Sequence, residues 1–240
     1  MKFARFALFA ALPFIAGTAQ AASVAMSVVG GTNAVLPGSF NLDDTQNGAG
    51  GWSLAAYQAL VPAGVAYNGS AVKVISGAVK SAANGLFVNG PAKVTYTYLG
   101  YEAGYTNAAV NLDGGAEFFK NKGSGATAFG ATYTTKMSGA GFLDFAFRSA
   151  GYGQIDNSGG TTAVPPTKKC FIGIAYSSIF NKGTSIVALF DDSGANVDRD
   201  YDDLGVRIDV APIPLPAAGL LLLGAMGGLG AISRKRQTLA

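Results

Sequence analysis

The chain has 240 residues, of which 49% are hydrophobic and 13% are charged, and its formal net charge is +3. The high apolar fraction and small net charge exclude a disordered chain. The sequence contains no histidine, which excludes Ser-His-Asp and Cys-His catalysis and His-containing zinc sites. It also lacks a phosphate-binding loop and a dinucleotide-binding fingerprint, so we expect a non-enzymatic protein.

The first 21 residues form a predicted secretory signal peptide. Two basic residues precede an apolar run at 6–17, and Ala19 and Ala21 form a small-x-small site. This pattern predicts that signal peptidase cleaves before Ala22. The apolar run is too short to be a stable membrane span.

Residues 22–211 form a predicted single β-rich domain, which we call the body. Glycine accounts for 34 of the 240 residues, about twice its usual share. Turn signals such as Asn68-Gly69, Asn84-Gly85 and Asp113-Gly114 separate short apolar segments. Many short strands joined by tight turns predict an all-β fold of the β-sandwich or jelly-roll kind.

Hydrophobic periodicity predicts the elements of the body. Alternating apolar and polar residues predict half-buried strands at 93–98, 143–148 and 204–210. Continuous apolar runs predict central strands, covered on both faces, at 170–176 and 185–190. Shorter strands are predicted at 24–29, 72–76, 86–88, 110–112 and 128–134. The only predicted helix is 52–60, and the Gly-, Ser- and Thr-rich segment 151–167 is predicted to be the longest surface loop.

Seven of the 14 acidic residues lie between positions 191 and 209, near the end of the body. The candidate ligands in this cluster are Asp191, Asp192, Asp198, Asp200, Asp202 and Asp203. Oxygen-only clusters suit Ca²⁺, which takes about 6–8 oxygen ligands. The spacing of the cluster begins like that of an EF-hand loop, but Asp203 stands where that loop requires glycine. The pattern therefore predicts a calcium-bound β-loop that rigidifies the edge next to the C-terminal segment.

Charge repulsion is the physical reason for expecting a cation. Four aspartates within six residues disfavour a compact loop unless a cation, or a base such as Arg199, offsets them. A solvated, mobile loop in which Arg199 pairs locally needs no metal and is the alternative interpretation.

The C-terminal segment 212–240 combines three features. A short motif, Pro214-Leu215-Pro216-Ala217, begins an uncharged run at 215–232, and the basic residues Arg234, Lys235 and Arg236 follow. As a helix, the run would reach roughly 27 Å, close to the roughly 30 Å hydrocarbon core of a bilayer. The basic residues should stay cytoplasmic, which predicts that the body lies on the opposite, non-cytoplasmic side of the inner membrane.

This order of features resembles the PEP-CTERM class of sorting tails, in the variant whose signature reads Val-Pro-Leu-Pro-Ala. Here Ile213 stands in place of the valine, and the other four residues match. The resemblance implies processing near the motif by an exosortase, a membrane cysteine protease of Gram-negative bacteria, with the body then released or attached at the cell surface. A plain membrane anchor without processing is the alternative. Body segments such as 94–107 and 118–121 also resemble exported proteins with such tails, which implies only a β-rich secreted domain.

The charge distribution argues against nucleic-acid binding, because the two terminal segments hold five of the 17 basic residues and leave 12 against 14 acids in the body. Two functional classes remain. The first is a surface or extracellular-matrix protein associated with exopolysaccharide. The second is a secreted carbohydrate-binding module with a structural calcium site, because Tyr and Trp stack well on sugars. Its candidate aromatic residues are Trp52, Tyr57, Tyr101, Tyr105 and Tyr152.

Overall fold

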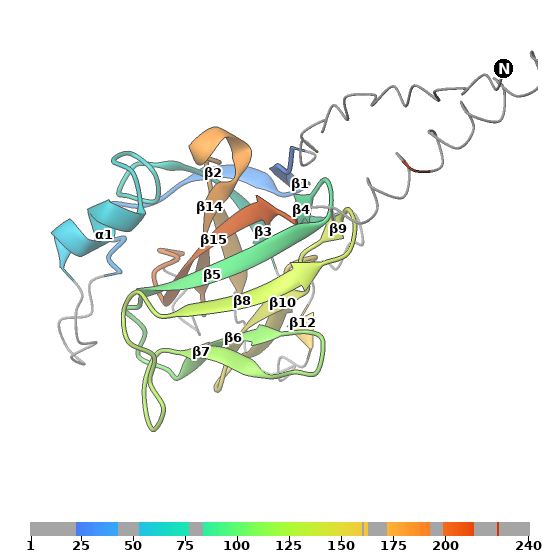
Figure 1. Ribbon diagram of the computed structural model, residues 1–240. Coiled ribbons are helices and arrows are strands. Elements are labelled where there is room, and N and C mark those ends of the chain that lie inside the picture. The colour runs from blue at the N-terminus through green and yellow to red at the C-terminus, as the bar shows by residue number, and fades with distance from the viewer. Residues whose placement is uncertain are drawn as a thin grey trace, which may run out of the picture. The chain divides into compact units, whose positions relative to one another are not determined.

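The computed structural model describes residues 23–42, 53–76, 84–159, 161–162, 172–192 and 199–213, together with Ala225. Residues Ala22–Ile213 form one compact unit. Among the described residues, all strand pairs of the three sheets are antiparallel and the one α-helix is short. The body therefore has an all-β fold (Figure 1).

The largest sheet has seven strands and runs in the order β2-β3-β13-β14-β15-β5-β8. Its strands are β2 (Thr32–Val35), β3 (Ala71–Ser76), β13 (Gly173–Ser177), β14 (Ser185–Asp191), β15 (Leu204–Pro212), β5 (Ala92–Gly100) and β8 (Thr132–Met137). A single 3₁₀ turn, Asn181–Gly183, lies between β13 and β14. The last strand of the body, β15, is thus an interior strand with a partner on each side.

Two smaller sheets complete the body. The five-stranded sheet consists of β12 (Thr161–Thr162), β11 (Gly153–Asp156), β10 (Phe145–Ser149), β6 (Asn107–Asn111) and β7 (Glu117–Lys120). The three-stranded sheet consists of β1 (Met26–Val29), β4 (Gly85–Val88) and β9 (Gly141–Phe142).

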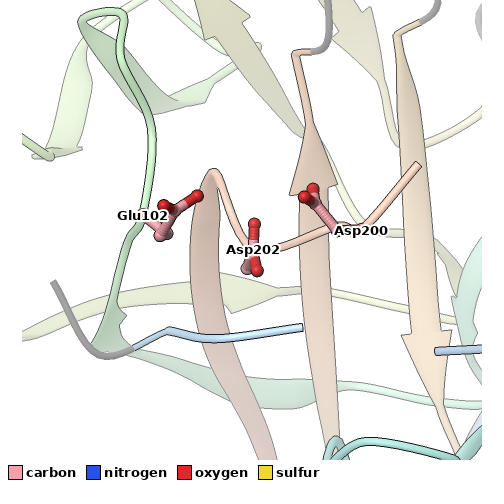
Figure 2. A group of neighbouring side chains, drawn as sticks. All are labelled: Glu102, Asp200 and Asp202. Carbon is pink, nitrogen blue, oxygen red and sulfur yellow. The ribbon is translucent and has the colours of Figure 1, made fainter. Parts of the chain in front are cut away.

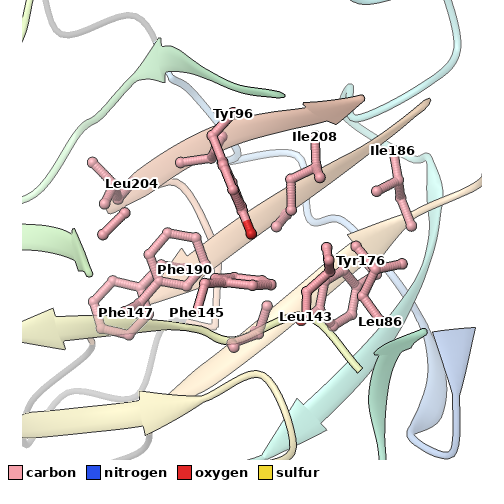
Figure 3. Packing of buried hydrophobic residues seen from close by; sticks show 14 of the residues in the cluster. Leu86, Tyr96, Leu143, Phe145, Phe147, Tyr176, Ile186, Phe190, Leu204 and Ile208 are labelled. Carbon is pink, nitrogen blue, oxygen red and sulfur yellow. The ribbon is translucent and has the colours of Figure 1, made fainter. Parts of the chain in front are cut away.

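The main hydrophobic core joins the seven-stranded sheet to the two smaller sheets. Alternate residues of β15, including Leu204 and Ile208, face this core together with Phe190 of β14. From the five-stranded sheet, Phe147 stacks on Phe190 with ring centroids 5.2 Å apart and Phe145 packs beside it (Figure 3). Aromatic pairs of this kind add about 0.5–1.5 kcal/mol to the stabilisation from area burial. They therefore help to hold the five-stranded sheet against the seven-stranded sheet; we call these two sheets the two layers.

A second core covers the opposite face of the seven-stranded sheet. The helix α1 (Leu54–Leu60) begins at Ser53, whose hydroxyl accepts a hydrogen bond from the Ala56 backbone N–H and caps the helix. Tyr57 of α1 packs over this face with Val187 and Leu189 of β14. Both faces of the central strands are therefore buried, in agreement with the prediction from their continuous apolar sequence.

A buried asparagine, Asn157, links the sheets where they meet. Its Oδ1 accepts hydrogen bonds from the Leu86 backbone N–H at 2.7 Å and from the Tyr176 hydroxyl at 2.6 Å. Its Nδ2 donates to the carbonyl oxygens of Leu86 at 3.1 Å and Leu143 at 2.9 Å. Figure 3 shows Leu86, Leu143 and Tyr176 close together in this part of the core. One side chain thus satisfies buried polar groups on separate elements, as buried polar groups require.

Most of the predicted strands are confirmed. The segments 93–98, 185–190 and 204–210 form β5, β14 and β15, while 72–76 and 86–88 form β3 and β4. The predicted strands at 24–29 and 110–112 correspond to β1 and β6, and 143–148 corresponds to β10. The strand predicted at 170–176 is observed as β13, although its residues 170–171 lie outside the described residues. The helix prediction is confirmed over Leu54–Leu60.

Several sequence predictions were wrong. Segment 151–167 is not a continuous loop, because β11 lies within it and pairs with β10, and Ile155 is fully buried. A single apolar residue between polar neighbours gives too little periodicity to indicate this strand. The strand expected at 128–134 is observed as β8, which begins at Thr132 and ends at Met137. Strands β2, β7, β9 and β12 were not predicted, because they are short and become ordered by pairing with their neighbours.

Two strands predicted to be half-buried are buried more completely. In β5 the alternation holds as far as Thr95, but Thr97 and Leu99 are also buried, because Leu99 belongs to the core on the opposite face. In β10 the residue expected to be exposed, Ala146, is buried against Ala108 and Val110 of β6.

Apart from Pro212, Ile213 and Ala225, the predicted terminal segments lie outside the described residues. These include the signal-peptide site at Ala19 and Ala21, the motif Pro214–Ala217 and the basic residues 234–236. Of the predicted span at 215–232, only Ala225 is described. Within the part of the chain that the structure describes, no helix has both the length and the apolar character that crossing a membrane requires.

Candidate cation site

The acidic cluster lies at one end of the seven-stranded sheet. Strand β14 ends there at Asp191, and β15 begins there at Leu204, because the two strands are antiparallel neighbours. Strand β5 is antiparallel to β15 on its other side, so its last residue, Gly100, lies at the same end. Antiparallel pairing therefore brings together three segments that are far apart in the sequence.

Three carboxylates converge at this end of the sheet. Oxygen atoms of Glu102, Asp200 and Asp202 all lie within 4.8 Å of one another. Figure 2 shows Asp202 between the other two residues, with Glu102 on the segment that follows β5 and Asp200 on the segment that leads into β15. The backbone N–H of Glu102 donates to the carbonyl oxygen of Asp202 at 2.8 Å and fixes the two segments side by side.

Asp202 is the buried member of this group, with 1% of its surface exposed. Its Oδ2 accepts a hydrogen bond from the Asn41 backbone N–H at 2.5 Å. Its Oδ1 is also buried, and no hydrogen-bond partner reaches it among the residues that the structure describes. An unsatisfied buried carboxylate oxygen lowers the stability of the fold by about 1–3 kcal/mol or more, and a ligand bound to this oxygen would remove that cost.

The segment before β15 has an unusual backbone. Arg199 and Tyr201 have φ values of 56° and 62°, in the left-handed region that non-glycine residues rarely adopt. The Tyr201 side chain is buried in the second core, on the face of the seven-stranded sheet that α1 covers, and anchors the segment. This geometry costs about 1–3 kcal/mol per residue, and such backbone conformations persist only where the surroundings enforce them.

The electrostatics of Asp202 show uncompensated negative charge. Its pKa is raised to about 9, chiefly by burial, then by the charge of Asp200 and a side-chain hydrogen bond with Asp200, and less by the charge of Glu102. The hydrogen bond from Asn41 acts in the opposite direction and does not outweigh them. A carboxyl in this environment is stabilised either by a proton or by a cation.

A second group of aspartates lies between the two layers. Asp192 and Asp203 are buried, and the Asp192 backbone N–H donates to Oδ2 of Asp203 at 2.5 Å. The pKa of Asp203 is raised to about 10, chiefly by burial and then by the charge of Asp192, with smaller contributions from Asp191 and Asp200. Asp191 lies two residues after Leu189 in β14, so both side chains are on the same face of the strand. Leu189 belongs to the second core, which contains Tyr57 of α1.

The burial of the aspartates tests the interpretation in which they form a solvated loop without a metal. The solvated loop paired by Arg199 is wrong for Asp202 and Asp203, because both side chains are buried. Asp200 is half-exposed and Arg199 is exposed. The remaining predicted ligand, Asp198, lies outside the described residues.

Glu102 was not among the predicted ligands. Glu102 is one of only two glutamates and lies four residues after the strand predicted at 93–98, which is the only sequence signal that it offers. The pairing of β5 with β15 brings it to the aspartates, and this pairing could not be deduced from the spacing of residues.

The aromatic residues considered for carbohydrate binding do not form an exposed platform. Tyr57, Tyr101 and Tyr152 are all buried, with at most 5% of their surface exposed. Tyr105 is 45% exposed, but its ring packs edge-on against Tyr152 and the two hydroxyls are hydrogen-bonded at 2.8 Å. Trp52 lies outside the described residues. Three of the four candidate tyrosines are therefore core residues, which is the usual position of such aromatic side chains, and they offer no exposed surface for a sugar.

Comparisons of the chain with protein families, with curated proteins and with solved structures returned no match. The chemistry of the site must therefore be argued from its residues. Three carboxylates supply oxygen ligands alone, which suit a hard cation such as Ca²⁺, whose coordination geometry is less strict than the octahedron of Mg²⁺.

Proposed function

We propose that this chain is an exported, non-enzymatic surface or extracellular-matrix protein whose β-sandwich body is stabilised by calcium. Glu102, Asp200 and Asp202 hold the ion at the end of the central sheet. The role of the ion is structural, because it connects the loop after β5 to the segment before β15.

The observation that carries this proposal is the convergence of three carboxylates on a buried, unsatisfied oxygen. Carboxylates that repel one another at close range are costly in a folded protein unless a positive charge offsets them. Asp202 Oδ1 has no hydrogen-bond donor within the described part of the chain and lies in a group whose oxygens are within 4.8 Å. A divalent cation would satisfy this oxygen and neutralise the repulsion together.

Titration calorimetry of the purified full-length protein with calcium tests the site. We expect calcium to bind at this site with Kd about 10⁻⁴–10⁻³ M, the range of extracellular calcium modules. Glu102→Gln and Asp202→Asn should each weaken this binding at least about tenfold, because each removes a charge and keeps the shape of the side chain.

Asp113→Asn is the matched control, since Asp113 is an exposed aspartate on a turn outside the site. It should bind calcium like the wild type. Absence of binding heat in the wild type, or equal loss in the control, would contradict the proposal.

The second half of the proposal concerns the ends of the chain. The signal-peptide pattern and the Pro214–Ala217 motif with its apolar run and basic end support export, followed by exosortase processing, in a Gram-negative bacterium. The chain would be anchored in the inner membrane until cleavage, and the body would then act at the cell surface, in association with exopolysaccharide.

Mass spectrometry of the protein recovered from the producing cell tests the processing step. We expect an N-terminus at Ala22 and a C-terminus near the Pro214–Ala217 motif. A variant with Pro214→Ala and Pro216→Ala should keep its basic end. An intact C-terminus carrying residues 234–236 in the wild-type protein would support a plain anchor and contradict processing.

A further inference from the structure

The space between the two layers contains a second group of oxygen ligands, separate from the three carboxylates described above. Asp192 and Asp203 approach it from the end of the seven-stranded sheet. Asn107 and Ser149 approach it from the five-stranded sheet, where they are direct partners in the pairing of β6 with β10. Direct partners on antiparallel strands place their side chains on the same face.

Both side chains of the five-stranded sheet contact the aspartates. The Ser149 hydroxyl donates to Oδ2 of Asp192 at 3.4 Å, and Nδ2 of Asn107 donates to the carbonyl oxygen of Asp203 at 3.4 Å. Ala109 and Phe147, two residues along these strands, belong to the main core, so this face of the sheet points inward. The four residues therefore line one buried region between the layers.

Asn107 supplies an observation independent of the acidic residues. It is fully buried, and its backbone N–H is satisfied by Oδ1 of Asn121 at 2.8 Å. Its own Oδ1 has no hydrogen-bond partner within the described residues. Nδ2 of Asn107 contacts the backbone carbonyl oxygen of Asp203, so the Asn107 amide lies against the segment that carries this aspartate.

We propose that a second calcium ion binds between the layers, held by Asp192, Asp203, the Asn107 amide oxygen and the Ser149 hydroxyl. This inference rests on the proposed calcium-binding function and adds a site on different residues. Carboxylate, amide and hydroxyl oxygens are the ligands that Ca²⁺ accepts, and backbone carbonyls or water can complete its shell of about 6–8.

The second ion would act differently from the first. Glu102, Asp200 and Asp202 lie on segments that adjoin β5 and β15, which are neighbouring strands of one sheet, whereas the interlayer ligands come from the end of that sheet and from the five-stranded sheet. An ion at the interlayer site would join the layers where the aromatic core ends.

Equilibrium dialysis of the full-length protein against calcium, with bound calcium measured by atomic absorption, tests this inference. We expect two bound ions per wild-type chain. Glu102→Gln should reduce the number to one by removing the first site, and Asn107→Ala should reduce it to one by removing the second. Ser149→Ala, a small change that leaves both aspartates in place, should weaken the second site about threefold to tenfold without altering the first.

The outcomes separate this inference from the proposed function. One ion in the wild type that is lost in Glu102→Gln but kept in Asn107→Ala overturns the interlayer site and leaves the proposed function intact. Two ions that are unaffected by both Asn107→Ala and Ser149→Ala also overturn it. No bound calcium in the wild type overturns both. If Asn107→Ala does not fold, the affinity change in Ser149→Ala decides the question.

Discussion

Replacing Asn157 with alanine should lower the free energy of unfolding by about 4 kcal/mol, because four hydrogen bonds are lost at once. The backbone N–H and carbonyl of Leu86, the carbonyl of Leu143 and the hydroxyl of Tyr176 would each lose their bond to this side chain. Each buried group left unsatisfied costs about 1–3 kcal/mol. Urea denaturation of the two proteins under the same conditions measures the difference.

Asn68→Ala is the matched control. Asn68 is exposed and donates a single hydrogen bond to the Gly38 carbonyl oxygen at 3.0 Å. Its replacement should cost less than about 1 kcal/mol, because water can replace the lost partner. Similar losses in the two variants would show that Asn157 does not connect the sheets as we describe.

Raising the pH should destabilise the protein strongly when calcium is absent. The pKa values of Asp202 and Asp203 in the folded protein are about 9 and about 10, far above the value of about 3.9 for an unfolded aspartate. Between these values the folded state binds more protons than the unfolded state, so stability is greatest below about pH 4 and falls as pH rises towards 9–10. The loss is about 1.4 kcal/mol per pH unit for each carboxyl that stays protonated in the fold. One such carboxyl gives on the order of 4 kcal/mol between pH 5 and pH 8, measured by urea denaturation in the presence of a chelator.

Calcium should reverse this loss at pH 8, because the ion replaces the protons. At a calcium concentration one hundred times the Kd, binding adds about 2.7 kcal/mol to the free energy of unfolding. Asp202→Asn removes one of the titrating groups and should give a shallower pH dependence without calcium. A metal-free protein whose stability is constant or rises from pH 5 to pH 8 would contradict the raised pKa values.

The strands that could be predicted are those whose sequence pattern is long. The run Ser185–Phe190 is apolar at nearly every position, and β14 is buried on both faces as a result. Residues 204–210 alternate, and their apolar members face the main core in β15. Strand β11 could not be predicted, because Ile155 is its only large apolar residue and its pairing with β10 decides its conformation.

The site could be predicted only in part, for a related reason. The density of aspartates near position 200 predicts a cation site, and Asp200 and Asp202 belong to the group of carboxylates that the structure brings together. Glu102 and Asn107 come from segments about one hundred residues earlier; the pairing of β5 with β15 brings Glu102 to the aspartates, and packing of the five-stranded sheet against the seven-stranded sheet brings Asn107 there. Spacing along the chain carries no information about such pairing, because the order of strands in a sheet is a tertiary property.

Diffraction from crystals of the protein grown with calcium, recorded at a wavelength where calcium scatters anomalously, tests the central claim most directly. We predict an anomalous peak about 2.3–2.6 Å from carboxylate oxygens of Glu102, Asp200 and Asp202. A map without such a peak at millimolar calcium, in which Asp200 and Asp202 share a hydrogen bond instead, would show that a proton and not a cation satisfies the buried carboxylate.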